Sequence, residues 1–361
     1  MDFVSEFSPN WLSPPGASVS DILEERGVSV REFAEQVGCD IRTATQFLMG
    51  SESVSVEFAA NLARVVGSTK DFWLRREETY VRERQRISSS DSVDELHSWL
   101  DSIPVGLMIR EGWLSRKERS LDLAQAALAF FGVPSLAAWR AKYVEGFGRT
   151  AYRTSSAVRS VHGAVAYWSR QGEILAREIE CEPWSPEKFQ LTLKEVRALT
   201  RLRNPEEFLP ELQKLCAASG VAIVPLKAPT GCPVSGAVSF TSPNKALMLL
   251  SFRYLTDDQF WFTFFHEAGH LLLHARRGWF MEGLENVLED AEAEADRFAE
   301  IGLLGEDGHA YLQTLPRNHF AIARFAKRIG VSPGVVVGIL QRAGRVPYKH
   351  FNRLKVFYTW S

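Results

Sequence analysis

The sequence contains no run of about 18 apolar residues, the length that a membrane-spanning helix requires. It has only four cysteines in 361 residues, and none shows the CxxC spacing typical of zinc ribbons and redox motifs. Residues 1–6 are acidic and show no apolar segment of the kind found in a secretory signal. These absences favour a cytoplasmic protein with free thiols and no membrane partner.

An excess of charge of one sign is also missing, because 42 basic residues balance 44 acidic ones and leave a net charge of −2. No overall basic field therefore indicates binding to nucleic acid or to a membrane surface. The hydrophobic content of 45% and the charged content of 24% are typical of a globular protein. A length of 361 residues predicts two or three domains.

An apolar helix expected over residues 257–275 contains a His-Glu-x-x-His motif at His266, Glu267 and His270. Residues four apart lie on one face of a helix, so both imidazoles can point at one Zn2+. Glu267 stands next to the first histidine, where its carboxylate can take a proton from a zinc-bound water. The alternative is a helix face on which the motif occurs by coincidence.

A catalytic zinc site of this kind needs a third protein ligand. The next strong helical pattern carries Glu292 and Asp296, which are four residues apart and therefore share a face. We expect Glu292 to bind the metal and Asp296 to accept the free ring N–H of a ligand histidine. Glu294 is the alternative third ligand. We expect His274 to contact a ligand residue without binding the metal itself. The alternatives are that His274 binds the metal or that it caps the C-terminal end of the helix.

The N-terminal part of the chain shows short helical patterns separated by tight turns. Ser29 and Glu32 have the spacing of a capping box before a helix over residues 30–37, and a three-residue turn leads to a helix over residues 41–49. This layout is that of a helix-turn-helix. The segment resembles the Xre/HigA-type helix-turn-helix family at Gly27-Val28-Ser29, Phe33-Ala34, Val37-Gly38, Thr43, Phe47-Leu48, Gly50, Leu62-Ala63 and Asp71-Phe72-Trp73-Leu74.

The resemblance implies DNA binding, with residues 41–46 facing the major groove. Between Asp21 and Lys70, however, eight acidic and five basic residues give a net charge of −3, whereas Lys and Arg supply most of the nonspecific affinity for DNA. The candidate base or phosphate contacts are the side chains of Arg42, Thr43, Thr45 and Gln46. Docking of a protein or formation of a homodimer is the alternative role of this module.

Three strands are predicted before the motif helix, over residues 221–226, 234–240 and 245–251. A small sheet followed by such a helix is the plan of gluzincin metallopeptidases. In that plan the last strand lies beside the metal and pairs with an extended substrate through its free edge. The strand expected to align the substrate contains Lys245, Leu247, Leu249 and Ser251.

Four segments, over residues 256–270, 292–299, 335–341 and 351–355, resemble the ImmA/IrrE family of zinc metallopeptidases. Xre-type domains are often fused to such peptidases or encoded beside them. The resemblance implies cleavage of a regulatory protein, commonly a helix-turn-helix repressor, in a stress or mobile-element response. The glycine-rich stretch 301–308 departs from the family, which usually continues there into an apolar segment ending in proline, and this departure bears on specificity.

The sequence thus predicts an α+β fold that is mostly α. The expected parts are a helix-turn-helix bundle over residues 1–86, a helical connector over 87–203, a gluzincin-like peptidase domain over 204–305 and a C-terminal helical region over 306–361. The expected function is that of an endopeptidase with Zn2+ as cofactor and a protein as substrate. The alternatives are a DNA-binding transcriptional regulator, or an antitoxin, whose peptidase-like domain acts as a sensor.

Overall fold

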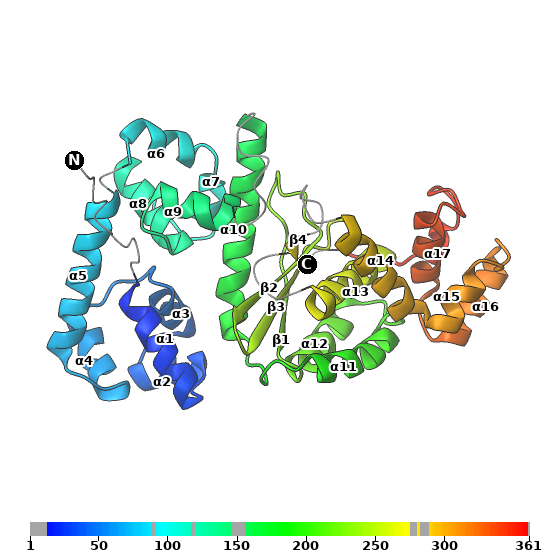
Figure 1. Cartoon of the computed structure of the whole chain (residues 1–361), viewed down its shortest axis with the longest axis horizontal. Helices are drawn as coiled ribbons and strands as arrows, with labels where there is room; N and C mark the ends of the chain where they lie inside the picture. The colour runs from blue at the N-terminus through cyan, green and yellow to red at the C-terminus, as the bar shows by residue number, and fades with distance from the viewer. Residues whose placement is uncertain are drawn as a thin grey trace, which may run out of the picture. The chain divides into compact units, whose positions relative to one another are not determined.

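The structure is a computed structural model that describes residues 13–88, 91–116, 120–145, 156–274, 280–281 and 289–359. The chain divides into two compact units, Met1–Glu145 and Gly146–Ser361 (Figure 1). The described residues are mostly helical and include one small sheet. This composition confirms the α+β, mostly α class.

The first unit is entirely helical in the residues that the structure describes. Its elements are α1 (Pro15–Arg26), α2 (Val30–Val37), α3 (Ile41–Leu48), α4 (Val56–Val65), α5 (Lys70–Ser88), α6 (Val93–Leu100), α7 (Val105–Arg110), α8 (Ser120–Phe131), α9 (Leu136–Arg140) and the π-helical turn η1 (Ala141–Glu145).

The helix pair α2–α3 forms the expected helix-turn-helix, and local signals set its ends. The Ser29 hydroxyl accepts the Glu32 N–H, while the Glu32 carboxylate accepts the Ser29 N–H, so the capping box at the start of α2 is formed. Gly38 ends α2 with φ 77°, a left-handed conformation that glycine adopts without a steric cost. The rings of Phe33 and Phe47 then stack in the core between the two helices, 6.4 Å apart.

The second half of the first unit is held by aromatic side chains. The rings of Trp99, Phe131, Trp139 and Tyr143 lie within 6.0 Å of one another in successive pairs, which draws α6, α8, α9 and η1 into one core. No single helix among the described residues has the length and apolar character to cross a membrane. The bent pair Leu121–Phe131 and Leu136–Glu145 passes that test only when its two helices are combined.

The second unit contains the sheet and the helices that cover it. Its elements are α10 (Ser156–Glu178), α11 (Pro186–Leu199), α12 (Pro205–Ala217), β1 (Val221–Pro225), β2 (Gly236–Ser242), β3 (Lys245–Leu250), α13 (Asp257–Leu273), β4 (Phe280–Met281), α14 (Glu289–Leu304), α15 (Glu306–Leu312), α16 (His319–Ile329), α17 (Pro333–Arg342) and the 3-10 turn η2 (Asn352–Leu354).

The strands run in the order β1-β3-β2-β4, with β1 parallel to β3 and the other neighbours antiparallel. Side chains alternate between the faces of a strand. Leu247 and Leu249 of β3 therefore face the core that includes Trp168 of α10, whereas Ala246 and Met248 face the core that includes α12 and α13. Because helices cover both faces, β1 and the part of β3 after Lys245 are apolar throughout, as in other doubly covered sheets.

The expected connector over residues 87–203 is divided between the two units. Residues up to Glu145 belong to the first unit, because the aromatic core described above holds α6 to η1 together. The helices α10 and α11 belong to the second unit, where Trp168 packs on the sheet and Phe189 enters the large core. The parts expected over residues 204–305 and 306–361 share this core and lie in one unit.

Candidate metal centre

The helix α13 places the His-Glu-x-x-His residues in the interior of the second unit. His266, Glu267 and His270 are all buried, with at most 1% of each residue exposed. The helix α14 crosses α13 at Gly269, where an added Cβ would lie only 3.2 Å from the Cα of Ala295. Glycine at this position therefore permits the close crossing that brings α14 to the two histidines.

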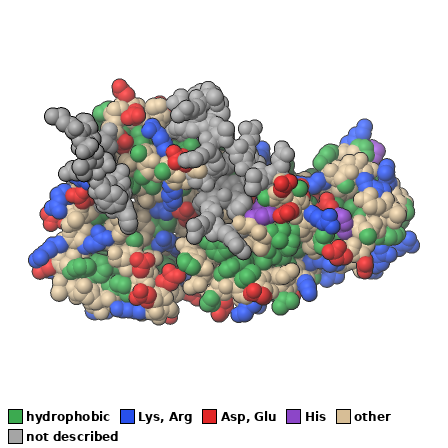
Figure 2. Space-filling view, viewed as in Figure 1, with side chains coloured by type: hydrophobic (Ala, Val, Ile, Leu, Met, Phe, Trp, Pro, Cys, Tyr) green, Lys and Arg blue, Asp and Glu red, His purple; other side chains and the backbone are tan. Residues whose placement is uncertain are grey.

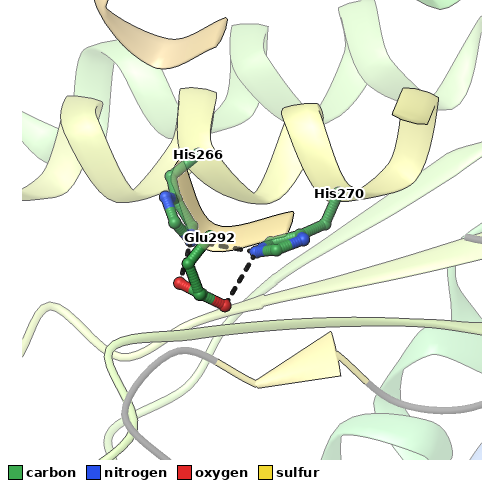
Figure 3. Close-up of side chains that lie close together, drawn as sticks. All are labelled: His266, His270 and Glu292. Atoms are coloured by element: carbon green, nitrogen blue, oxygen red, sulfur yellow. Dashed lines mark hydrogen bonds and ion pairs between the residues drawn. The ribbon is translucent and has the colours of Figure 1, made fainter. Parts of the chain in front are cut away.

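The three expected ligands converge at this crossing (Figure 3). The Nε2 atoms of His266 and His270 are 3.0 Å apart, and each lies 3.3 Å from a different carboxylate oxygen of Glu292. Among the residues that the structure describes, no other group of three His, Cys, Asp or Glu side chains brings its ligand atoms within 4.8 Å of one another.

This donor set fits a catalytic zinc site. Two imidazoles and one glutamate are a known catalytic combination that leaves one coordination position for water or substrate. The ligand atoms of a tetrahedral Zn2+ bound at about 2.0–2.1 Å stand roughly 3.3 Å apart. The observed separations of 3.0 and 3.3 Å match that spacing.

Asp296 supports His266 from the side away from the other ligands. Its Oδ1 lies 2.9 Å from His266 Nδ1 and 3.0 Å from Nη1 of Arg342 on α17. With Nε2 facing the ligand cluster, Nδ1 of His266 is assigned the hydrogen and donates it to Asp296. The Arg342 guanidinium also lies 3.7 Å from the centre of the Phe262 ring, which holds it over α13.

His274 supports His270 in the same manner and is in turn held by Glu294. His270 Nδ1 lies 3.1 Å from His274 Nδ1, and His274 Nε2 lies 2.9 Å from Glu294 Oε2. The network assigns hydrogens to His270 Nδ1 and His274 Nε2, so that each ring donates to the next acceptor. Glu294, the alternative third ligand, therefore contacts a supporting histidine and lies outside the ligand cluster.

The electrostatics of the site favour ionised carboxylates. Burial alone would raise the pKa of Glu292, but the bonds from His266 and His270 outweigh it and lower that pKa to about 2. Burial also opposes ionisation of Asp296, yet the contacts with His266 and Arg342 lower its pKa below the usual range. Both side chains are thus anionic at neutral pH, the form in which they bind a metal or orient an imidazole.

Glu267 lies against the backbone of β2. A Cβ added at Gly236 would come within 2.6 Å of Glu267 Oε1 and of Thr263 Cγ2, so only glycine fits there. Neither Gly236 nor Arg342 was expected at this site. A glycine inside a strand signals close approach by a neighbouring group, whereas nothing in the sequence around Arg342 indicates its contact with Asp296.

The expectation of a substrate strand at Lys245, Leu247, Leu249 and Ser251 is wrong in one respect. The strand β3 lies between β1 and β2 and pairs with both, so it has no free edge along which a peptide could add. Ser251 lies just beyond its end and is buried. The strand that borders Glu267 is β2, whose outer edge pairs with the two residues of β4.

The candidate DNA contacts on α3 are mostly engaged within the first unit. Thr45 is fully buried and donates its hydroxyl to the Ile41 carbonyl, so the expectation that it contacts DNA is wrong. The Thr43 hydroxyl donates to Asp40, the residue that caps α3.

Arg42 and Gln46 differ from the two threonines. The Arg42 side chain is exposed, but it donates to the Glu111 carbonyl and lies 4.7 Å from the centre of the Trp113 ring. Gln46 is half-buried. Arg42 would have to leave these contacts to reach a phosphate or a base.

One stretch of 66 residues is 33% identical to an uncharacterized HTH-type transcriptional regulator, YddM, of Escherichia coli (strain K12). The match covers 70% of that protein and 18% of this chain. The chain belongs to the helix-turn-helix family. No family model matches the chain. The likeness supports a helix-turn-helix domain in this chain and gives no evidence about a peptidase.

Proposed function

We propose that the chain is a zinc-dependent endopeptidase that cleaves a regulatory protein. The observation that carries the proposal is the convergence of His266, His270 and Glu292 beside the buried Glu267. The resemblance to ImmA/IrrE peptidases adds the expectation that the substrate is a helix-turn-helix repressor in a stress, mobile-element or toxin-antitoxin response.

Each residue of the metal centre has its own role in the proposed reaction. When bound, Zn2+ acts as a Lewis acid and lowers the pKa of a bound water to about 7. Glu267 would serve as the general base and then the general acid, taking a proton from the attacking water and returning it to the leaving amine. Asp296 and His274 keep the Nε2 atoms of the two ligand histidines aimed at the metal position. His266, Glu267 and His270 are buried, and a less polar surrounding strengthens the electrostatic interactions of these three side chains.

Metal analysis and one substitution test this proposal. We expect one zinc per chain in the purified protein. Glu267→Gln should retain the zinc but lose about 10²–10⁴-fold in cleavage rate, because removal of a general base has that effect. The control is Glu195→Gln on the exposed face of α11, which should leave both zinc and cleavage unchanged. Absence of stoichiometric zinc, or full activity of Glu267→Gln, would contradict the proposal.

The substrate can be found with the same variant. Because Glu267→Gln keeps the ligands and lacks the base, it should hold an intact substrate that the parent protein releases as fragments. Capture of a helix-turn-helix protein by the variant, and its cleavage by the parent, would identify the regulatory target. Cleavage of this chain itself would appear in the parent protein and be absent in the variant.

A second candidate function is that of a DNA-binding regulator whose second unit senses a ligand or partner. The likeness to an HTH-type transcriptional regulator favours it, and the acidic charge around α2 and α3 opposes it. This function predicts that the full chain binds DNA of its own promoter in a gel-shift assay at low salt and that the complex dissociates as the salt concentration rises. No shift at low salt would leave the helix-turn-helix as a protein-docking module, and co-purification of a small toxin would indicate an antitoxin.

A further inference from the structure

A hollow in the second unit is lined by five basic side chains. It has a volume of about 440 Å3 and lies where the end of α11, the helix α16, the start of α17 and the segment around η2 meet. None of the described residues that line it is acidic. We call it the basic pocket, and its cations are Arg201, Arg203, Lys327, Arg353 and Lys355.

The charge of the basic pocket is not explained by the composition of the chain. The chain as a whole has a net charge of −2, so five cations in a hollow whose described lining contains no acidic residue are a local concentration of positive charge. On the face drawn in Figure 2, Lys and Arg side chains also gather at the end of this unit where α15 and α16 lie. A hollow lined by charge of one sign focuses the field and attracts ions of the opposite sign.

One of the five cations is held rigidly and partly neutralised. Only 9% of the Lys355 side chain is exposed, and its Nζ donates to Asp258 Oδ2 at 2.7 Å and to Gln341 Oε1 at 2.8 Å. The side chains of Arg201, Arg203, Lys327 and Arg353 are exposed, so four cations remain to receive an anion.

The N-terminal end of α17 contributes little to the attraction of an anion into the basic pocket. Asp257 accepts the Ser332 hydroxyl at the N-terminus of α17. A Cβ added at Gly334 would come within 2.3 Å of the Asp257 carboxylate, so that carboxylate already occupies the helix end. The positive field in the basic pocket therefore comes from the side chains.

We propose that the basic pocket binds a small molecule that carries a phosphate or polyphosphate group, such as a nucleotide. Guanidinium groups match phosphate oxygens with two parallel N–H donors, and three of the cations are arginines. The apolar side chains of Val331 and Leu354, which also line the hollow, suit the less polar part of such a molecule. The volume lies within the range of about 300–1,000 Å3 that is usual for small-molecule sites.

The convergence of the cations favours a compact ligand over a nucleic acid. Single strands are bound by grooves whose charges follow the backbone, whereas these five cations come from three segments and meet at one hollow. The basic pocket contains neither the ligands of the metal centre nor Glu267. Its function is therefore independent of the proposed peptidase activity.

Calorimetric titration of the full chain with inorganic pyrophosphate, and with ADP, tests the proposal. The parent protein should bind both anions. The double variant Arg203→Ser/Lys327→Ser should bind at least about tenfold more weakly, because each charge-assisted bond contributes more than a neutral one. The control Lys188→Ser/Arg324→Ser removes two exposed cations from the same unit outside the basic pocket and should bind as the parent does.

Several outcomes would overturn the proposal. In the first, the parent protein binds neither anion. In the second, the double variant and the control lose the same affinity. In the third, the double variant binds pyrophosphate as tightly as the parent does, which would place the bound anion at the metal centre. Tight binding of a single-stranded oligonucleotide that pyrophosphate does not displace would point to a nucleic-acid surface. The variant Arg203→Lys/Lys327→Arg preserves the charge and should recover most of the affinity, which separates loss of charge from loss of folding.

Discussion

The helix pairs α2–α3 and α13–α14 are joined over very different distances in the sequence. In the first pair the N-terminal caps join residues three apart, as between Ser29 and Glu32. Phe33 of α2 stacks on Phe47 of α3 within the same short segment. In the second pair His266 meets Asp296 across 30 residues. Caps and contacts between near neighbours thus account for much of the helix-turn-helix, whereas the metal centre exists only if α13 and α14 cross closely.

The acidic residues of the two pairs also differ in what they contact. Around α2 and α3, the carboxylates of Glu32 and Asp40 cap helices at the surface. On α14, the carboxylates of Glu292, Glu294 and Asp296 each lie against a histidine of α13 or just beyond its end. The same residue type thus shapes the fold locally in the first unit and assembles a chemical site in the second.

The largest effect should follow from removal of Glu292, the ligand that α14 contributes. We expect Glu292→Ala to lower zinc affinity by more than the roughly 10–100-fold loss that accompanies removal of a supporting residue. The matched change Glu294→Ala removes a carboxylate two residues away that contacts only the supporting His274. Zinc affinity measured by competition with a chelator should fall far less in Glu294→Ala. Equal losses would show that the helices cross differently.

The next largest effect should come from Gly236, which lies against the proposed base. In Gly236→Ala the new methyl group would lie 2.6 Å from Glu267 Oε1, closer than such atoms normally approach, and would push that carboxylate away from its position. We expect a loss of about 10²-fold or more in cleavage rate, the lower end of the contribution of a general base. Zinc content should stay unchanged.

A second glycine provides the control for this prediction. Around Gly308 on α15, a new Cβ would meet its nearest neighbour at 3.4 Å, an ordinary contact. Gly308→Ala should therefore leave the cleavage rate as in the parent. Full activity of Gly236→Ala would show that Glu267 is not the base.

A smaller effect is expected from the support of His266. Asp296→Asn keeps an acceptor for the ring N–H but removes the negative charge that Arg342 also contacts. Zinc affinity should fall about 10–100-fold, the usual cost of such a change. Arg297→Gln, the exposed neighbour on α14, is the control and should bind zinc normally. Unchanged affinity in Asp296→Asn would mean that packing alone orients the imidazole.

The smallest effect belongs to the first pair. Ser29→Ala removes the side chain that accepts the Glu32 N–H at the start of α2. The free energy of unfolding should fall by about 1 kcal/mol, the typical value of such a cap. Urea unfolding followed by circular dichroism measures this loss, and zinc content should not change. A loss of zinc in Ser29→Ala would contradict the separation of the two pairs.

Much of the local structure could be predicted from residue patterns. The end of α2 follows from Gly38 and the start of α3 from the Asp40 cap, because each signal acts within a few residues. The strands β1, β2 and β3 were expected close to their observed bounds. The order of the strands could not be predicted, because pairing depends on which strands meet in the folded chain. In the structure β3 lies between β1 and β2.

The division into units could not be predicted from the polar stretch at residues 87–92. That stretch marks a break between helices, but the aromatic residues beyond it, Trp99 and Trp139 among them, pack with α6 to η1 in the first unit. A boundary is decided by which side chains share a core, and helical periodicity does not carry that information. The burial of Thr45 was missed for the same reason.

The sequence by itself determined the helix-turn-helix layout, the His-Glu-x-x-His helix and the acidic helix that follows, because periodicity, caps and spacing are properties of neighbouring residues. Only the tertiary structure decided that Glu292, rather than Glu294, meets both histidines, that Arg342 holds Asp296, and that Gly236 faces Glu267. These contacts join residues far apart in the chain. They depend on the angle and closeness at which helices and strands pack, which no local pattern specifies.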